Sequence, residues 1–412
     1  MLSLIISIIA LGFIIAFHEL GHFAVAKLFG VGVIEYSIGM GPRILSFVKG
    51  NTRYSLKAMP FGGSCMMLDE DGTGPDTADE ERLADLCAAY GAETLDITED
   101  AYIIDGRYYP KSSKFSLKPA WQRFLVVLAG PVFNFFLAFV FGLIITMHYG
   151  YDRATILETD PGMAMSEAGI ESGDTITGLG ILAEAPVETG RMTVEITRHM
   201  HLSQIDTARD ISLFMTAHDR EMQSGAVFIV RYLDFSEGNT PKTAGVVPSY
   251  DEEAGRYRLG FTYSTAYAPA DNAGEVVRYA AYNVIFCMRS SLESIRMLIR
   301  GRANAGDVVG PVGMVAAMDE SMDEAASSGG VVAAVMTLIN IMILISGSLG
   351  FMNLLPIPAL DGGRLLFILV EMIIRRPVPR EIESRIHAAG MLLLLGLMAM
   401  ILFNDVISLI FR

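Results

Sequence analysis

The first residues that could do chemistry stand near the start of the chain, in the pentapeptide His18-Glu19-Leu20-Gly21-His22. On a helix, residues four apart lie on one face about one turn apart, so both histidines can reach a single metal ion. The glutamate beside the first histidine can hold a water on that ion and take its proton. This HExxH pattern predicts a catalytic zinc site with His18 and His22 as ligands and Glu19 as general base.

A catalytic zinc site usually has three protein ligands and one open position, so a third ligand must come from elsewhere in the chain. The best candidate is Asp361, within Asn353-Leu-Leu-Pro-Ile-Pro-Ala-Leu-Asp361-Gly-Gly363. The two prolines break a helix there and the two glycines permit a tight turn, which lets the carboxylate point back into the protein. An N-cap of the following helix is the alternative interpretation of Asp361. The remaining histidines have no such partner and are expected at surface or interfacial positions: His148, His199, His201, His218 and His387.

The composition indicates a membrane protein with a sizeable water-exposed part. Of the 412 residues, 52% are hydrophobic and only 19% are charged, which is too apolar for a soluble protein of this length. The net charge of −15 argues against a nucleic-acid partner, since a phosphate-binding surface needs a basic excess. The three cysteines have unrelated spacings, which predicts free thiols rather than a disulfide framework or a thiolate zinc site: Cys65, Cys87 and Cys287.

Four apolar stretches have about the 20 residues that a helix needs to cross a bilayer. They run over residues 2–29, 121–148, 331–355 and 388–411. The first has no basic start and no small-residue cleavage site, and it continues into the HExxH motif. A retained helix is therefore favoured over a cleaved signal peptide.

Basic residues near the ends of these stretches predict the orientation. They gather between the first and second stretches and in the short link between the third and fourth, so both segments are expected on the cytoplasmic side. Both termini and residues 149–330 are then expected outside. At about 1.5 Å per residue, His18 lies roughly 25 Å along its helix, near the cytoplasmic side. Asp361, at the cytoplasmic end of the third stretch, is expected at a similar depth.

The segments between the stretches carry their own patterns. Residues 31–65 are rich in glycine and β-formers, which predicts a short hairpin or sheet. Residues 69–105 are acidic, which is typical of a solvated, partly ordered insert. Residues 275–300 have the amphipathic pattern of a helix that lies on the membrane surface or against the helix bundle.

The long outside segment combines alternating apolar residues with turn signals, which predicts one compact α+β domain of roughly 110 residues. Its expected elements are a helix and a strand on either side of the Gly173–Asp174 turn within Ala164–Gly178, a helix over 204–217, and strands at Ala226–Val230 and Tyr257–Phe261.

The HExxH motif in the first stretch and the late NxxPxxxLDGG segment resemble the site-2 protease family of intramembrane zinc metalloproteases. The similarity is closer to the bacterial branch that includes the regulator of sigma-E protease. Further landmarks extend the resemblance over most of the chain: a β-region at Tyr36–Pro42 and Met59–Gly63, a GPxxN segment at Gly130–Asn134, the start of a PDZ domain at Pro161–Ile176, and a GPxG segment at Gly310–Met314.

The resemblance implies a role for each matching residue. These roles are zinc ligation by His18, His22 and Asp361, general-base catalysis by Glu19, contact with the substrate or the oxyanion by Asn353, and a structural or substrate-contacting role for Asn134. The implied activity is regulated intramembrane proteolysis with a Zn²⁺ cofactor. The implied substrates are single-pass membrane proteins, such as anti-sigma factors, or remnant signal peptides.

The resemblance also implies where the other parts act. The β-region would pair with the unwound substrate, and the PDZ-like domain would contact the substrate ectodomain or a new C-terminus. The expected location is the bacterial plasma membrane, with the PDZ-like domain outside and the active site near the cytoplasmic side. Only one PDZ-like domain is visible, and the acidic insert 69–105 and residues around 180–203 are additional. These departures leave regulation and substrate identity open.

The alternative is a catalytically inactive membrane PDZ scaffold or another metal-binding membrane protein. Glu19 argues against a purely structural zinc site, because such a site needs no base. The favoured fold class is a polytopic α-helical membrane protein with about four transmembrane helices, a membrane-associated β-region and one inserted α+β PDZ-like domain. Its expected order is a transmembrane helix with HExxH (1–30), the β-region (31–68), the acidic cytoplasmic insert (69–118), a second transmembrane helix (119–149), the PDZ-like domain (150–265), an amphipathic helix and linker (266–328), a third transmembrane helix with NxxPxxxLDGG (329–362), and a basic cytoplasmic link with a fourth transmembrane helix (363–412).

Overall fold

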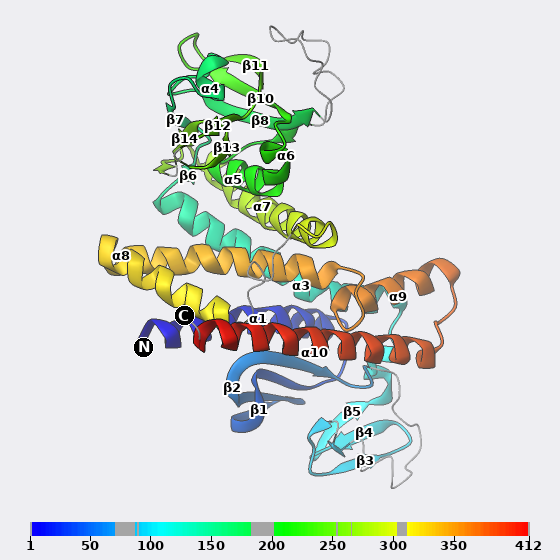
Figure 1. Cartoon of the computed structure of the whole chain (residues 1–412). Helices are drawn as coiled ribbons and strands as arrows, with labels where there is room; N and C mark the ends of the chain where they lie inside the picture. Colours follow the sequence, from blue (N-terminus) through cyan, green and yellow to red (C-terminus); the bar gives the residue numbers. More distant parts are fainter. Residues whose placement is uncertain are drawn as a thin grey trace. The chain divides into compact units, whose positions relative to one another are not determined.

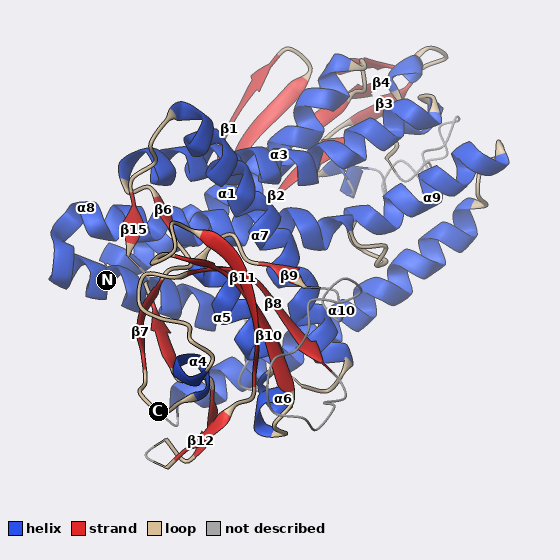
Figure 2. Cartoon of the chain, turned by 90° about the horizontal axis from the view of Figure 1, so that it is seen from above, coloured by secondary structure: helices blue, strands red, loops and turns tan. Residues whose placement is uncertain are grey.

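A computed structural model of the chain describes residues 2–70, 87–88, 90–182, 202–252, 254–264, 266–302 and 311–410 (Figures 1 and 2). It divides into two compact units. The first contains Met1–Gly142, Asn283–Ser291 and Arg300–Arg412, and the second contains Leu143–Tyr282 and Leu292–Ile299. Helices α3 (Ala120–His148) and α7 (Ala273–Ile299) contribute residues to both units.

Three long apolar helices form the frame of the first unit: α1 (Leu2–Leu28), α3 and α8 (Pro311–Leu354). Among the described residues, these three have the length and composition to cross a membrane. Buried side chains join them, including Ile14 of α1, Leu137 of α3 and Met342 of α8. Most of the side chains in these helices are apolar: some of them pack against one another, and others, such as Ile9 and Phe136, are exposed.

The C-terminal helices differ in part from what the sequence predicts. The fourth expected span falls in α10 (Arg380–Ile410), in which the described apolar segment Arg385–Gly396 is shorter than a span. The count of four spans therefore stays a prediction. Residues 311–328, expected as part of a linker, instead form the start of α8, which breaks at Gly330 (φ 71°). Good helix formers such as Ala, Met and Glu fill this segment, and Met318 and Met322 are buried.

The predicted hairpin is present as β1 (Val33–Lys49) and β2 (Thr52–Met67). Both strands are long and bent, so the ribbon folds on itself. Tyr36 pairs with Tyr54 and also with Cys65, while Tyr54 pairs with Phe47. The pairs define four segments in the order 43–49, 52–57, 33–40 and 59–67. The last segment forms an edge that contacts α1.

The acidic segment, expected as a solvated and partly ordered insert, contains a folded part at residues 95–110, which the sequence pattern did not predict as strands. They form a three-stranded antiparallel sheet, β3 (Leu95–Ile97), β4 (Ala101–Ile104) and β5 (Arg107–Pro110), followed by the short 3-10 turns η1 (Lys111–Ser113) and η2 (Phe115–Leu117). Tyr102, Ile104 and Tyr109 are buried against Ile34 and Leu68. Acidic residues within and between these short strands obscure the strand pattern in the sequence. Residues 71–86 lie outside the described part of the chain.

The second unit has the α+β composition expected of it. Its main sheet has the order β11-β10-β8-β9, and α5 (Ala208–Ala217) supplies Ile211 and Phe214 to the core. The strands of this sheet are β8 (Thr175–Leu182), β9 (Ser203–Gln204), β10 (Val227–Asp234) and β11 (Thr240–Val246). Smaller elements complete the unit: β6 (Tyr151–Asp152), β7 (Ile156–Thr159), α4 (Ala164–Glu167), α6 (Asp219–Gln223), β12 (Ser249–Asp251), β13 (Arg256–Arg258), β14 (Phe261–Tyr263) and β15 (Tyr267–Ala268).

Two details of this unit differ from the sequence prediction. The helix expected over 204–217 begins later, because Thr207 and Asp210 form a capping box that fixes its start. The strand expected over Tyr257–Phe261 is interrupted at Gly260, whose φ is 72°. The additional residues around 180–203 fall largely in 183–201, outside the described residues. Whether the unit is a PDZ domain stays a prediction.

The polypeptide turns sharply between α8 and α9 (Asp361–Ile374). Helix α8 ends at Leu354, and the next six residues include Pro356 and Pro358, which cannot continue a helix. Helix α9 then packs against α1 and α3, where Leu365 and Ile368 join a buried cluster. This turn brings a late segment of the chain to the helix that carries the HExxH motif.

Candidate metal centre

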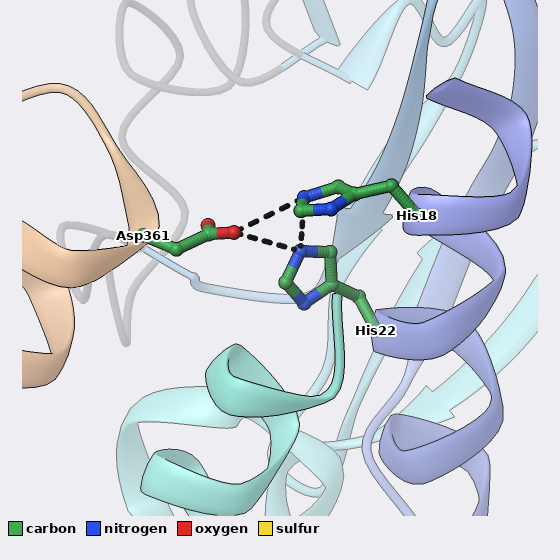
Figure 3. A group of neighbouring side chains, drawn as sticks. All are labelled: His18, His22 and Asp361. Atoms are coloured by element: carbon green, nitrogen blue, oxygen red, sulfur yellow. Dashed lines mark hydrogen bonds and ion pairs between the residues drawn. The ribbon is translucent and has the colours of Figure 1, made fainter. Parts of the chain in front are cut away.

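His18, His22 and Asp361 converge on one point (Figure 3). Both imidazole rings project from α1, and the carboxylate faces them from the first residue of α9. The two Nε2 atoms are 3.2 Å apart, and Oδ2 of Asp361 lies 3.1 Å from the Nε2 of His18 and 3.4 Å from that of His22. Both histidines are buried. The structure therefore brings together the three residues that the sequence singled out.

The three residues fit a zinc ion. Tetrahedral zinc with ligand bonds of about 2.0–2.1 Å holds neighbouring donor atoms roughly 3.3 Å apart, which is the separation of the three atoms here. Oδ2 of Asp361 is buried and has no hydrogen-bond partner, which indicates that a cation belongs in front of it. Two imidazoles and one carboxylate are a donor set that suits zinc.

Two glycines allow α3 to approach the motif on α1. A Cβ atom at Gly21 would lie 2.4 Å from the carbonyl oxygen of Ala129. A Cβ atom at Gly130 would lie 2.3 Å from Nε2 of His22 and 2.8 Å from Cε1 of His18. Any side chain at Gly130 would therefore occupy the space in front of the histidines.

A tight turn presents Asp361. Cβ atoms at Gly362 and Gly363 would lie 2.0 Å from the carbonyl oxygen of Leu355 and 2.6 Å from that of Ile357, so only glycine fits at either position. The N-cap of α9 is Leu360, and Asp361 is the first helical residue. The N-cap interpretation of Asp361 is therefore wrong, and its carboxylate is directed at the histidines instead.

Helix α3 orients both histidine rings through contacts with their Nδ1 atoms. Nδ1 of His22 lies 2.9 Å from the carbonyl oxygen of Val126, which can only accept, so this nitrogen carries the proton. Nδ1 of His18 lies 3.1 Å from the side-chain amide of Asn134. When Nε2 of His18 faces a metal, its Nδ1 must donate a hydrogen bond. The side-chain oxygen of Asn134 is buried and has no partner. Exchanging the positions of the amide oxygen and nitrogen by a flip of the side chain makes this oxygen the acceptor. Both contacts fix the tautomer that metal binding needs.

Glu19 lies beside the edge of the hairpin. Its Oε2 accepts a hydrogen bond of 2.9 Å from the backbone N–H of Cys65, and its Cγ would touch a Cβ atom at Gly63. Tyr36 donates from its hydroxyl to the carbonyl oxygen of Ala16, 2.7 Å away, and ties β1 to the same helix. The hairpin thus holds the glutamate next to the two histidines.

The other expected site residue is not joined to this group. Asn353 lies near the end of α8 and is half-buried, and among the described residues it has no hydrogen bond to the triad or to Glu19. Conversely, sequence reasoning missed two contacts. The Val126 carbonyl has no sequence signal, because every residue has one. His387, for which the sequence predicted only a surface or interfacial position, accepts a hydrogen bond from the backbone N–H of Ala359, close to Asp361.

A buried pair of histidines one helical turn apart, with an adjacent glutamate and a carboxylate from a distant helix, defines the class of HExxH metalloproteases. The sequence matches the profile of peptidase family M50 over residues 6–397. The chain therefore belongs to peptidase family M50, the site-2 protease family of membrane zinc metalloproteases.

Named relatives agree with this assignment. The chain is 27% identical over 455 residues to the regulator of sigma-W protease RasP of Bacillus subtilis, covering 98% of each chain. It is 27% identical over 453 residues to the zinc metalloprotease RasP of Bacillus licheniformis, again covering 98% of each. A Clostridium acetobutylicum protein, named provisionally as a zinc metalloprotease, is 29% identical over 405 residues, which cover 98% of this chain and 97% of the relative. The protein is thus a zinc-dependent protease.

Proposed function

We propose that the protein is an intramembrane endopeptidase in which His18, His22 and Asp361 hold the zinc and Glu19 is the general base. The observation that carries this proposal is the convergence of three donor atoms from two distant segments at the spacing of zinc ligands. Zinc bound there supplies Lewis acidity for the scissile carbonyl and a water of lowered pKa.

The chain's own residues do the remaining work. Glu19 takes the proton of the attacking water and passes it to the nitrogen of the leaving amine. The N–H of Cys65 holds one carboxylate oxygen of Glu19, which leaves the other free to meet the water. Asn134 and the Val126 carbonyl keep the histidine tautomers in place. Asn353 is kept as a candidate for substrate or oxyanion contact, to be tested by substitution.

The substrate must be extended before attack, because the peptide bonds of a helix are shielded by their own hydrogen bonds. The edge segment 59–67 of the hairpin suits this need, since an extended peptide can add to a sheet edge. At Cys65 this edge meets Glu19, so a strand added there would run past the general base. Single-pass membrane proteins are the proposed substrates, of the anti-sigma-factor or remnant-signal-peptide kind, and the regulatory name of the Bacillus subtilis relative supports the first.

The proposed orientation follows the basic residues near the ends of the membrane helices. The hairpin, the three-stranded sheet and the link between α9 and α10 face the cytoplasm, and the α+β unit lies outside. The metal centre is then near the cytoplasmic side of the membrane. The α+β unit, as a PDZ-like domain, contacts the ectodomain or a new C-terminus of the substrate.

The test uses the full chain purified in detergent and a single-pass model substrate. Three arms are compared: wild type, Glu19→Gln, and wild type with a zinc chelator, with bound metal counted in each. Cleavage in the first arm alone, with about one zinc retained by Glu19→Gln, supports the assigned roles. Cleavage by Glu19→Gln would refute the base assignment. Zinc retained at full affinity by Asp361→Asn would refute the ligand set.

A further inference from the structure

The loop that carries Asp361 contains a residue in an unusual backbone conformation. Ala359 has a φ of 75°, in the left-handed region that residues with a Cβ atom rarely adopt. It lies two residues before the proposed ligand, at the point where the chain turns into α9. A loop held in such a conformation requires contacts that stabilise it, because otherwise the backbone relaxes to an ordinary conformation.

Helix α10 supplies such a contact. The backbone N–H of Ala359 donates a hydrogen bond of 3.0 Å to Nδ1 of His387. The His387 ring also lies against the Phe367 ring of α9, with 5.6 Å between the centroids. Because a backbone N–H can only donate, Nδ1 of His387 must be unprotonated here. The imidazole therefore accepts a hydrogen bond from the loop while its ring packs against α9.

Helix α10 also lies directly against the loop one turn further on. A Cβ atom at Gly390 would lie 2.3 Å from Cβ of Pro358 and 2.9 Å from its carbonyl oxygen. Only a glycine allows the helix to approach this closely, and this approach brings His387 within hydrogen-bond distance of Ala359. The other backbone hydrogen bonds described for the loop residues themselves are local, such as the one of 3.2 Å from the Leu360 N–H to the carbonyl oxygen of Ile357.

We propose that His387 is a positioning residue for the metal centre. Its Nδ1 fixes Ala359 in the left-handed conformation and so fixes where the Asp361 carboxylate stands relative to His18 and His22. On the other side of Asp361, Arg364 of α9 makes an ion pair with Glu70, in the turn that follows β2. The third ligand is thus held from both directions along the chain. This inference rests on the proposed ligand set.

The test measures zinc affinity in the full chain in detergent, by competition with a chromophoric chelator, beside cleavage of the model substrate. His387→Leu keeps the bulk of the side chain and removes the acceptor, so zinc should bind about 10–100-fold more weakly. In His387→Asn the side-chain oxygen takes the place of Nδ1, and zinc affinity should stay close to that of the wild type. Ile386→Ala, an exposed neighbour on α10, is the matched control and should change nothing.

A double variant separates positioning from general damage to the fold. Glycine adopts a φ of 75° without strain, so Ala359→Gly should make zinc affinity far less sensitive to the residue at 387. His387→Leu combined with Ala359→Gly should therefore regain most of the lost affinity. Unchanged zinc affinity in His387→Leu, or a loss that neither Asn nor Ala359→Gly reverses, overturns the proposal. Failure of the ligand set itself appears separately, as full zinc affinity in Asp361→Asn.

Discussion

The two histidines present the same ring nitrogen to the centre because helix α3 engages the other. Nδ1 of His22 faces the Val126 carbonyl and Nδ1 of His18 faces Asn134. A neutral imidazole has only one proton, so these contacts decide that Nε2 keeps its lone pair for a metal. At the scale of single residues, the site therefore depends on Asn134 and the Val126 carbonyl as well as on its three proposed ligands.

Replacing Asn134 tests this dependence. Asn134→Leu removes the acceptor behind His18, and zinc affinity should fall about 10–100-fold, as is typical when the partner of a metal-bound histidine is lost. The measurement is chelator competition on the full chain. Ser346→Ala is the matched control, because Ser346 is equally buried and donates to the backbone oxygen of Asn134 rather than to its side chain. Equal losses in both variants would contradict the proposed role.

The proposed site residues could be predicted from the sequence to different degrees. His18, Glu19 and His22 follow from helical spacing alone, which is a local property. Asp361 could be named as a candidate because prolines and glycines around it predict a turn, but only the fold decides against its N-cap interpretation. The contact of His387 with Ala359 could not be predicted, because no residue pattern near either position indicates it.

At the scale of elements, the contact between α1 and α3 depends on the absence of a side chain at Gly130. Gly130→Ala places a methyl group 2.3 Å from Nε2 of His22, too close for the ring to keep its position, so the variant should lose bound zinc and cleavage together. Overpacking of this kind also costs about 1–3 kcal/mol of stability. Gly396→Ala, in α10 with no neighbour within 4 Å, is the control and should keep both. Normal zinc content in Gly130→Ala would show that α3 shifts to accommodate the methyl group without disturbing the site, which would contradict the prediction.

The β10–β11 hairpin of the α+β unit carries a pH-dependent contact. Hydrogen bonding from Lys242, with Nζ 2.7 Å from Oδ2, lowers the pKa of Asp234 from an ordinary 3.8 to about 2. The ionised carboxylate therefore favours the folded state. Its contribution is complete above the ordinary pKa and is lost as the pH falls through the folded-state pKa near 2.

Lys242→Met tests the contact by its pH profile. The difference in unfolding midpoint between wild type and Lys242→Met should be largest above pH 4 and should shrink as the pH falls towards about 2. Thermal unfolding of the full chain, followed across this range, gives the measurement. Lys242→Arg, which keeps the charge, should retain most of the difference from Lys242→Met. A difference that does not vary with pH would mean that packing, not charge, links the two residues.

Prediction of the elements succeeded where patterns were long and local. The hairpin at residues 33–67 and the amphipathic helix α7 have extended signals, and both are present. The three-stranded sheet at 95–110 was missed because its strands are three or four residues long and lie among acidic residues. Such strands are stabilised by burial of Tyr102 and Tyr109 against Leu68, a tertiary contact that no short window contains.

At the scale of the whole molecule, the proposed orientation can be tested by labelling. In a cysteine-free background, Phe235→Cys in the exposed β10–β11 turn should react with a membrane-impermeant maleimide in intact cells. Arg376→Cys, in the exposed link between α9 and α10, should react only after the membrane is opened. The reverse labelling pattern would indicate the opposite orientation, with the metal centre near the outer side of the membrane. The parent without cysteines should stay unlabelled throughout.

The separation of the ligands along the chain has a consequence for biogenesis. More than 300 residues lie between His22 and Asp361, although their side chains meet. Ribosomes add about 5–20 residues per second, so roughly 20–70 s pass between synthesis of the HExxH helix and that of α9. Throughout this interval the nascent chain has only two of its three proposed ligands, so we expect it to be inactive. Neighbouring nascent membrane proteins meet an active protease only after its own insertion is nearly finished.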